Sequence, residues 1–363
     1  MKKLFTPGPV QLDPRVLESL AKPVISHRVE EFRRILGEAE EKLAKIYRAN
    51  GYIALLTGSG TLAVESMIYS LLDPGERLLI ISHGVFARRA AKTARSRGVL
   101  VDLVESPQLG APVGVEELKR RIDNGGYDAL LIVYNETSIG LAYRDLEQVA
   151  RYAKNQGLLV LVDAVSALAG EYLETSSWRL DAVASASQKA IAAPPGLSFV
   201  ALSDEALEKA GRTKHKPDYM DLVSYYNFYK RRRETPYTPS VNLVYALNKA
   251  LDIILEKGLY QWIESHRRRA TILYEKLGNI GFKPVVGDER YRSNTVTAFY
   301  TTTINVSASA IASRLYEKDI VIAMGIGENR DRIIRIGVMG NIGENDIVEL
   351  VGEIEETVSL LRK

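Results

Sequence analysis

The feature that most constrains the fold is an alternation of short apolar runs and helical patterns over residues 50–200. The clearest run, residues 158–163, is apolar at every position before its final acid, as in a parallel strand that is buried on both faces. Strands that alternate with helices in this way are typical of a parallel sheet covered by helices on both faces. We therefore expect an α/β fold with a mostly parallel sheet.

The pattern changes towards the C-terminus, which predicts a second, smaller unit. A long predicted helix at 243–256 ends near Gly258, a typical helix stop. We place the domain boundary there. The predicted parts are an N-terminal arm at 1–20, stiffened by prolines and expected to lie over the mouth of a site, a large domain at 21–257 and a small α+β domain at 258–363.

Within the small domain, the sequence predicts strands near residues 296–298 and 302–306, and a half-exposed strand at 332–337, where charged and apolar residues alternate. The basic run at 230–233, just before this domain, is expected to be a solvated loop. A nucleic-acid surface would require more such runs with interleaved aromatic residues.

Composition excludes several classes of function. Formal charges of 48 Lys+Arg and 45 Asp+Glu leave a net charge of +3, which argues against bulk binding to nucleic acid or membrane. The absence of cysteine excludes disulfides, thiolate metal sites and a cysteine nucleophile, and the four histidines show no ligand spacing. No apolar run reaches the ~18 residues of a membrane span. We expect a cytoplasmic protein with no metal, and few Asn and Gln beside 26% charged residues point to a thermophile.

A glycine loop, Gly58-Ser59-Gly60-Thr61, separates a predicted strand at 52–57 from a predicted helix at 62–72. Such a helix N-terminus binds anions through its free N–H groups and its dipole. With Ala63, the loop also matches a dinucleotide fingerprint, which requires an acid after the next strand. Residues 82–84 supply no acid. We favour a single phosphate, and a nicotinamide-dependent oxidoreductase is the rival interpretation.

Lys189 lies among small, mostly apolar residues between two hydrophobic runs. Desolvation would lower the pKa of its amine, and a neutral amine can form a Schiff base with a carbonyl. Asp163 ends the clearest strand, where open α/β sheets bind ligands, although a helix cap or a turn would explain it equally well. With Phe86 as a stacking ring and Arg335 as a carboxylate ligand, these residues supply what pyridoxal phosphate requires.

The sequence resembles the class V aminotransferases of fold type I, and most closely the serine–pyruvate/alanine–glyoxylate branch. The resemblance rests on motifs in the same order along nearly the whole chain: Pro-Gly-Pro at 7–9, Gly-Ser-Gly-Thr at 58–61, Asn-Glu-Thr-Ser-Ile-Gly at 135–140, Val-Asp-Ala-Val-Ser at 162–166, Ser-Gln-Lys-Ala at 187–190, Thr-Pro-Tyr-Thr-Pro at 235–239 and Arg-Ile-Gly at 335–337. Relatives often have tryptophan in place of Phe86, and some have histidine or tyrosine in place of Thr61 and Thr235.

The resemblance implies that Lys189 binds pyridoxal phosphate covalently and acts as general base, while Asp163 pairs with the pyridine nitrogen. It implies further cofactor contacts for Ser59, Gly60, Thr61, Phe86, Thr137, Val165, Gln188, Thr235 and Thr238, and substrate contacts for Gly8 and Arg335. Thr235 and Thr238 would reach the phosphate held by the neighbouring subunit, which implies a homodimer with shared active sites.

The resemblance thus predicts transfer of the amino group of serine or alanine to pyruvate or glyoxylate. Another enzyme that uses the same cofactor, such as a 2-aminoethylphosphonate aminotransferase or a lyase, is an alternative. A cysteine desulfurase is excluded because the chain has no cysteine. A non-catalytic relative that binds a partner protein is a further alternative, against which the intact Lys189 and Asp163 argue.

Overall fold

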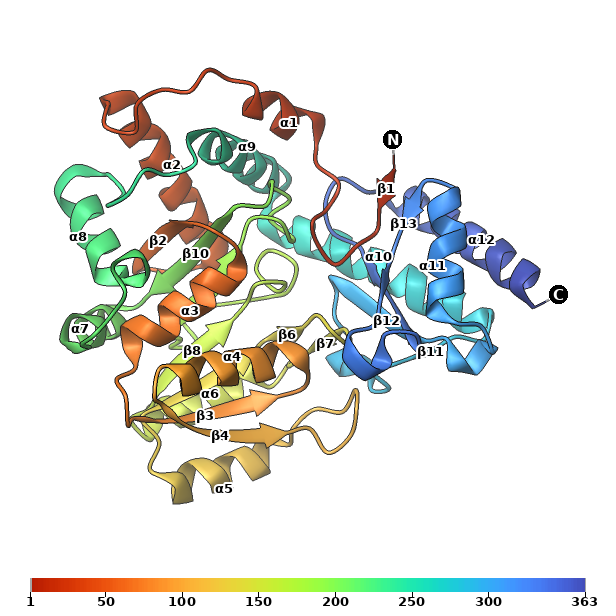
Figure 1. Ribbon diagram of the computed structural model, residues 1–363, viewed down its shortest axis with the longest axis horizontal. Coiled ribbons are helices and arrows are strands. Elements are labelled where there is room, and N and C mark those ends of the chain that lie inside the picture. Colours follow the sequence, from red (N-terminus) through yellow and green to blue (C-terminus); the bar gives the residue numbers. More distant parts are fainter. Residues whose placement is uncertain (1, 363) are drawn as a thin grey trace.

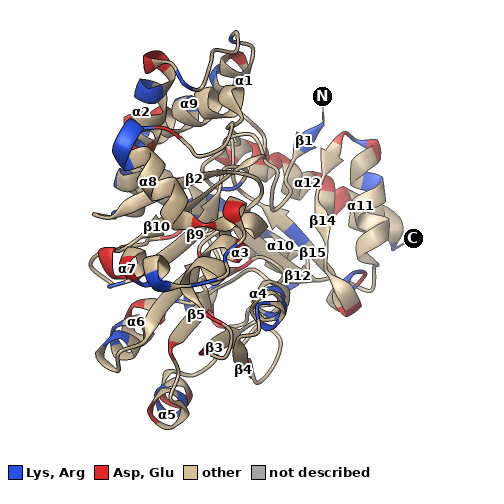
Figure 2. Cartoon of the chain, turned by 60° about the vertical axis from the view of Figure 1, so that its left-hand side comes forward, with Lys and Arg blue, Asp and Glu red and all other residues tan. Residues whose placement is uncertain are grey.

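The computed structural model describes residues 2–362. These residues form a large part built on a seven-stranded sheet and a smaller part built on a four-stranded sheet, which lie side by side (Figure 1). No helix in this stretch is both long and apolar enough to cross a membrane. Helices with charges of both signs cover the outside, in keeping with the nearly balanced net charge (Figure 2).

The large sheet has the strand order β2-β10-β9-β8-β5-β3-β4. All neighbours are parallel except that β10 runs antiparallel to both β2 and β9, which confirms the mostly parallel α/β fold. The strands are β2 (Tyr52–Thr57), β3 (Arg77–Ser82), β4 (Leu100–Glu105), β5 (Ala129–Val133), β8 (Leu159–Asp163), β9 (Ala182–Ala186) and β10 (Leu197–Leu202).

Helices cover both faces of this sheet, as the alternation predicts. Along β3, Leu79 and Ile81 pack into one hydrophobic cluster and Leu78 and Ile80 into the other, because successive side chains of a strand point to opposite faces. The first cluster includes α2 (Glu30–Tyr47), α5 (Val115–Gly125), α6 (Leu146–Asn155) and α9 (Val241–Lys257). The second includes α3 (Gly60–Leu71), α4 (Val85–Ser96), α7 (Asp204–Arg212) and α8 (Leu222–Arg232). The short helix α1 (Pro14–Leu20) packs against α9.

The smaller part is an antiparallel sheet in the order β11-β12-β15-β14 with helices against it. Its strands are β11 (Lys283–Pro284), β12 (Val296–Tyr300), β14 (Ala323–Met324) and β15 (Ile333–Gly337), and its helices are α10 (Leu259–Asn279), α11 (Ala308–Glu317) and α12 (Glu344–Leu361). The division of the chain at Gly258 remains a prediction, but α9 does end there, because Gly258 has φ +86°.

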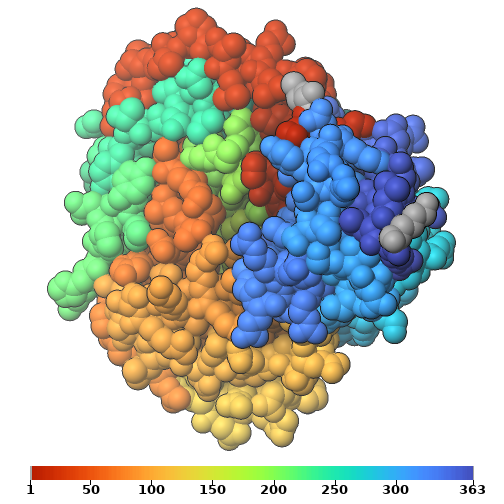
Figure 3. All heavy atoms as spheres, turned by 45° about the vertical axis from the view of Figure 1, so that its right-hand side comes forward, coloured from red at the N-terminus to blue at the C-terminus, as the bar shows by residue number. Residues whose placement is uncertain are grey.

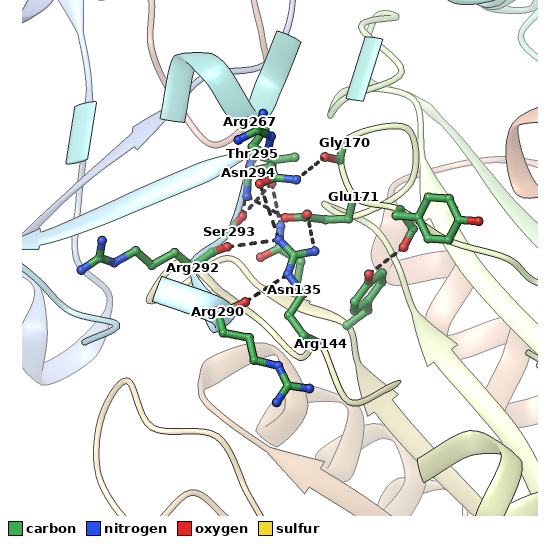
Figure 4. A network of polar contacts seen from close by, with 12 residues as sticks. Asn135, Arg144, Gly170, Glu171, Arg267, Arg290, Arg292, Ser293, Asn294 and Thr295 are labelled. Carbon is green, nitrogen blue, oxygen red and sulfur yellow. Dashed lines mark hydrogen bonds and ion pairs between the residues drawn. The ribbon is translucent and has the colours of Figure 1, made fainter. Parts of the chain in front are cut away.

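The N-terminal segment joins the two parts. Its strand β1 (Lys3–Leu4) pairs in parallel with β13 (Ile320–Val321), and Phe5 is buried in the core of the smaller part. Figure 3 shows this red segment where the large and small parts meet. A polar network forms a second junction (Figure 4): Arg144 binds the buried Glu171 at 2.7 Å, and Glu171 accepts the Asn294 N–H at 2.7 Å.

Three sequence-based expectations are wrong. Residues 302–306 form a 3₁₀ turn at Thr302–Ile304 rather than a strand, because the left-handed Asn305 turns the chain. The strand β15 is buried throughout, because it lies between β12 and β14 and both of its faces are covered. The basic run at 230–233 forms the last turn and cap of α8, where cations are favoured by the helix dipole.

Candidate active site

A cavity at the carboxyl ends of the large sheet brings together all of the predicted cofactor residues except Thr235 and Thr238. The residues that line it come from α3, α4, the segments after β5 and β8, and the turn after β9: Ser59, Gly60, Thr61, Val64, Glu65, Phe86, Arg89, Ala90, Thr93, Val133, Asn135, Thr137, Asp163, Val165, Gln188 and Lys189. This is the edge at which open α/β sheets bind ligands.

Lys189 follows β9 and its Nζ donates a hydrogen bond of 2.5 Å to the carbonyl of Pro7. The N-terminal segment thus contacts the lysine directly. Burial, together with the charge of Arg335, lowers the pKa of Lys189 to about 8, and Asp163 opposes both. At pH 7, about a tenth of this amine is therefore neutral and able to attack a carbonyl, far more than for a lysine with an ordinary pKa.

Asp163 ends β8 with its side chain 7% exposed. Its Oδ1 accepts the Val165 N–H at 2.9 Å. Burial raises the pKa of Asp163 to about 6, against the Val165 hydrogen bond, and nearby Glu136 adds to the increase. A cationic group in the cavity would stabilise the ionised carboxylate, which is how this acid could hold a ring nitrogen protonated.

The start of α3 forms one end of the cavity, where an anion could bind. The helix begins at Gly60, so the N–H groups of its first turn have no acceptors within the helix. A Cβ at position 60 would lie 2.8 Å from Val165 Cγ2 and 3.1 Å from Ala186, so only glycine allows the helix to approach this closely. Oε1 of Gln188 is buried without a partner among the described residues. This arrangement could hold a phosphate group.

The segment after β5 supplies polar groups to the same cavity. Thr137 Oγ1 lies 2.7 Å from Ser166 Oγ, and the Asn135 amide donates to the Ser166 carbonyl at 3.1 Å. The buried Glu136 accepts the Phe86 N–H at 3.1 Å and so caps α4. Sequence reasoning noted this segment but assigned only Thr137.

Arg89 also belongs to the cavity, although the sequence analysis does not predict it. It lines the cavity, and its guanidinium lies 4.8 Å from the ring centroid of Phe86. The helical spacing could have identified it, because residues three apart on a helix are neighbours and Phe86 is a predicted cofactor residue. Phe86 thus lies in the cavity with a cation beside its ring.

The two predicted substrate residues adjoin the cavity rather than line it. Arg335 donates to the carbonyl of Thr137 at 3.1 Å and to the carbonyl of Met324 at 2.9 Å. Burial lowers the pKa of Arg335 to about 10, and Glu136 opposes this. Gly8 has φ +117°, and a Cβ there would lie 2.8 Å from Lys189 Cδ, so a side chain at position 8 would displace the lysine.

Thr235 and Thr238 do not reach the cavity of their own chain. Thr235 is buried, and its hydroxyl donates to the Tyr237 carbonyl at 2.7 Å. The preceding Glu234 binds Arg28 at 2.5 Å and Arg33 at 2.7 Å, which fixes the segment in place.

Comparison with known proteins shows to which family this chain belongs. The profile of the family Aminotransferase class-V matches residues 4–330. The chain belongs to the class V aminotransferases. An uncharacterized aminotransferase of Methanocaldococcus jannaschii is 36% identical over 98% of this chain and 92% of its own length. The serine–glyoxylate aminotransferase of Arabidopsis thaliana is 30% identical, over 97% and 89%. A crystal structure of a subgroup IV aspartate aminotransferase from Thermus thermophilus is 33% identical, with a TM-score of 0.90 and 99% of each chain covered.

The cofactor of this aminotransferase is pyridoxal phosphate, and the cavity fits it. Lys189 would offer an amine for its aldehyde, Asp163 an acid for its ring nitrogen, and the start of α3 free N–H groups for its phosphate. When bound, the cofactor supplies an electron sink that makes the proton on the substrate's α-carbon labile.

Proposed function

We propose that this transaminase transfers the amino group of serine or alanine to pyruvate or glyoxylate. The observation that carries the proposal is that Lys189 and Asp163 line one cavity and that Arg335 adjoins it through Thr137. The similarity to a serine–glyoxylate aminotransferase supports the choice of a small donor.

Each residue has a stated task in this proposal. Lys189 Nζ, with its pKa lowered to about 8, takes the proton from the substrate's α-carbon and returns it later in the cycle. Asp163 holds the ring nitrogen protonated. Arg335, whose guanidinium is planar and has several donors, binds the substrate carboxylate through two hydrogen bonds.

Aspartate is the competing donor, because the Thermus relative is named for it. The test measures kcat/KM of the holoenzyme for serine, alanine and aspartate, each with pyruvate and with glyoxylate, by following the keto product. We expect serine or alanine with one of these acceptors to give the highest value. A higher value for aspartate, or no transfer to either acceptor, would overturn the proposal.

We also infer a homodimer in which each cofactor contacts both subunits. Support comes from Thr235 and Thr238, which lie outside the cavity of their own chain on a segment fixed by Glu234. Sedimentation equilibrium tests the assembly. Replacing Thr238 by Val should weaken cofactor binding, and unchanged cofactor affinity would contradict the shared site.

A cytoplasmic location and a thermophilic source complete the proposal. Their support is compositional: no cysteine, few Asn and Gln, and 26% charged residues. Cell fractionation tests the location. The midpoint of thermal unfolding of the holoenzyme tests the second inference, and a midpoint of about 45–65 °C, typical of mesophile domains, would contradict it.

A further inference from the structure

A second cavity lies on the other side of the turn that carries Lys189. Ala192 forms part of its wall, and Trp262, also in the wall, donates its indole N–H to the carbonyl of Ala190 at 3.0 Å. Helices α1, α9 and α10 and the loop after β15 close the cavity. Its lining residues are Asp13, Val16, Ala192, Ala250, Ile253, Lys257, Trp262, Arg269, Gly340, Asn341 and Ile342.

Two cations in this wall lack a carboxylate partner. Arg269 is 4% exposed; it donates to the carbonyl of Ile342, and its buried Nε has no acceptor within residues 2–362. Lys257 is exposed at the edge of the cavity, and its ammonium lies 5.3 Å from the ring centroid of Trp262. No Asp or Glu of the described chain lies within ion-pair distance of either cation.

The acids around the cavity are already paired with other cations. Asp13, in the wall itself, binds Arg15 at 3.0 Å. On α12, Glu344 binds Arg268 at 2.7 Å and Asp346 binds Lys3 at 3.1 Å.

Burial therefore acts mainly on Arg269, and the charges of Glu344 and Asp346 oppose it only in part. It lowers the pKa of Arg269 to about 10. Partial burial also lowers the pKa of Lys257; the charges of Arg269 and Arg268 add to that shift, and Glu344 opposes it. A buried charge without a partner is strongly unfavourable unless a counter-ion or hydrogen-bond acceptors compensate it. An anion in the cavity would supply both.

We propose that this cavity binds one small anion, either a halide or a small carboxylate such as formate, between Arg269 and Lys257. Both ligands carry a single negative charge and accept hydrogen bonds from cationic donors. Since Ala192 and Trp262 line the cavity, the bound anion stabilises the turn that positions Lys189. The inference is independent of which amino donor the enzyme uses.

Thermal unfolding of the holoenzyme tests the proposal. Sodium formate and sodium chloride are titrated separately against sodium gluconate at constant ionic strength, because gluconate carries the same charge on a much larger anion. A ligand that binds only the folded state raises the unfolding midpoint along a saturating curve. We expect such a curve for at least one of the two anions in the wild type, and the stronger anion identifies the ligand. Identical midpoints in all three salts would overturn the proposal.

A matched pair of variants locates the effect. Lys257→Met removes one cation of the cavity and should abolish the saturating rise. Lys276→Met removes an exposed lysine of the neighbouring helix α10 and should leave it unchanged. A rise of equal size in both variants would assign the anion effect to another part of the surface and refute the site.

Crystallography gives an independent measurement that requires no variant. Holoenzyme crystals soaked in sodium bromide should show an anomalous peak within hydrogen-bond distance of the Arg269 guanidinium. If formate is the stronger anion in the unfolding experiment, sodium formate in the soak should remove that peak. A bromide data set with peaks elsewhere and none in this cavity would contradict the proposal.

Discussion

The two cavities on either side of the Lys189 turn differ in how their charges are balanced. The cofactor cavity contains both signs: Lys189 and Arg89 face Asp163 within one lining. The second cavity, called the rear cavity below, contains Lys257 and Arg269. Its one acid, Asp13, is bound to Arg15. Burial perturbs the charged groups in both places, but only the cofactor cavity has an acid in its own lining that offsets its lysine. Lys257 is opposed by Glu344, which lies outside the lining and binds Arg268.

This difference explains why the cofactor cavity suits proton transfer and the rear cavity suits the binding of an anion. In the cofactor cavity, burial brings an amine and a carboxylate to pKa values of about 8 and about 6, so both change protonation near neutral pH. In the rear cavity, the arginine with a pKa of about 10 stays charged at neutral pH, so its field attracts an anion and moves no proton. The predictions below test this contrast.

The largest effect on activity is expected from a substitution in the cofactor cavity. Lys189→Ala should reduce the transamination rate by about 10³-fold or more, because covalent attachment and proton transfer both depend on Nζ. Keto-product formation and the visible absorbance of the purified protein measure the loss. Lys283→Ala, at an exposed lysine on β11, should retain both. A fully active Lys189→Ala enzyme would refute the role of the lysine.

Arg335 tests whether a buried cation beside the cofactor cavity serves the substrate. Arg335→Gln should raise KM for the amino acid by about 10- to 100-fold, because a charge-assisted pair of hydrogen bonds to the carboxylate is lost. Arg332→Gln, at an exposed arginine three residues earlier, is the matched control. Steady-state kinetics separate KM from kcat, and equal KM values in the two variants would show that Arg335 is only structural.

A substitution of Asp163 tests whether its carboxylate offsets the lowered pKa of Lys189. Covalent cofactor binding by the cofactor-free protein needs the neutral amine, so its rate should rise with pH with a midpoint at about 8. Because Asp163 raises the pKa of Lys189, Asp163→Asn lowers that pKa and should move the midpoint of the pH profile to lower pH. Stopped-flow absorbance measures the rate. A midpoint that moves to higher pH would show that the two charges do not interact as described.

The smallest effect is expected at the contact between the two cavities. Trp262→Phe removes the hydrogen bond to Ala190 and should lower the free energy of unfolding by about 1 kcal/mol relative to Trp178→Phe. Trp178 is similarly buried, and its indole N–H has no hydrogen bond within the described chain. Denaturant unfolding compares the two variants. Equal losses would mean that the Ala190 contact contributes nothing beyond packing.

Much of the fold was predictable because it depends on local patterns. The apolar run 158–163 predicted β8, and the glycine loop predicted the start of α3. The helix α12 was missed although Ile347, Leu350 and Ile354 show helical spacing. Residues 302–306 were misassigned because Thr, Ile and Val favour strands, whereas the left-handed Asn305 decides the local turn.

The sequence by itself determined which chemical groups this protein has: an amine at 189, an acid at 163, a glycine-led helix and no thiol. Only the tertiary structure decided which of these groups are buried together and therefore which pKa values move. It also decided that Arg269 and Lys257 lack carboxylate partners, because Glu344 binds Arg268 and Asp346 binds Lys3. Burial and pairing depend on residues far apart in sequence, so local patterns cannot specify them.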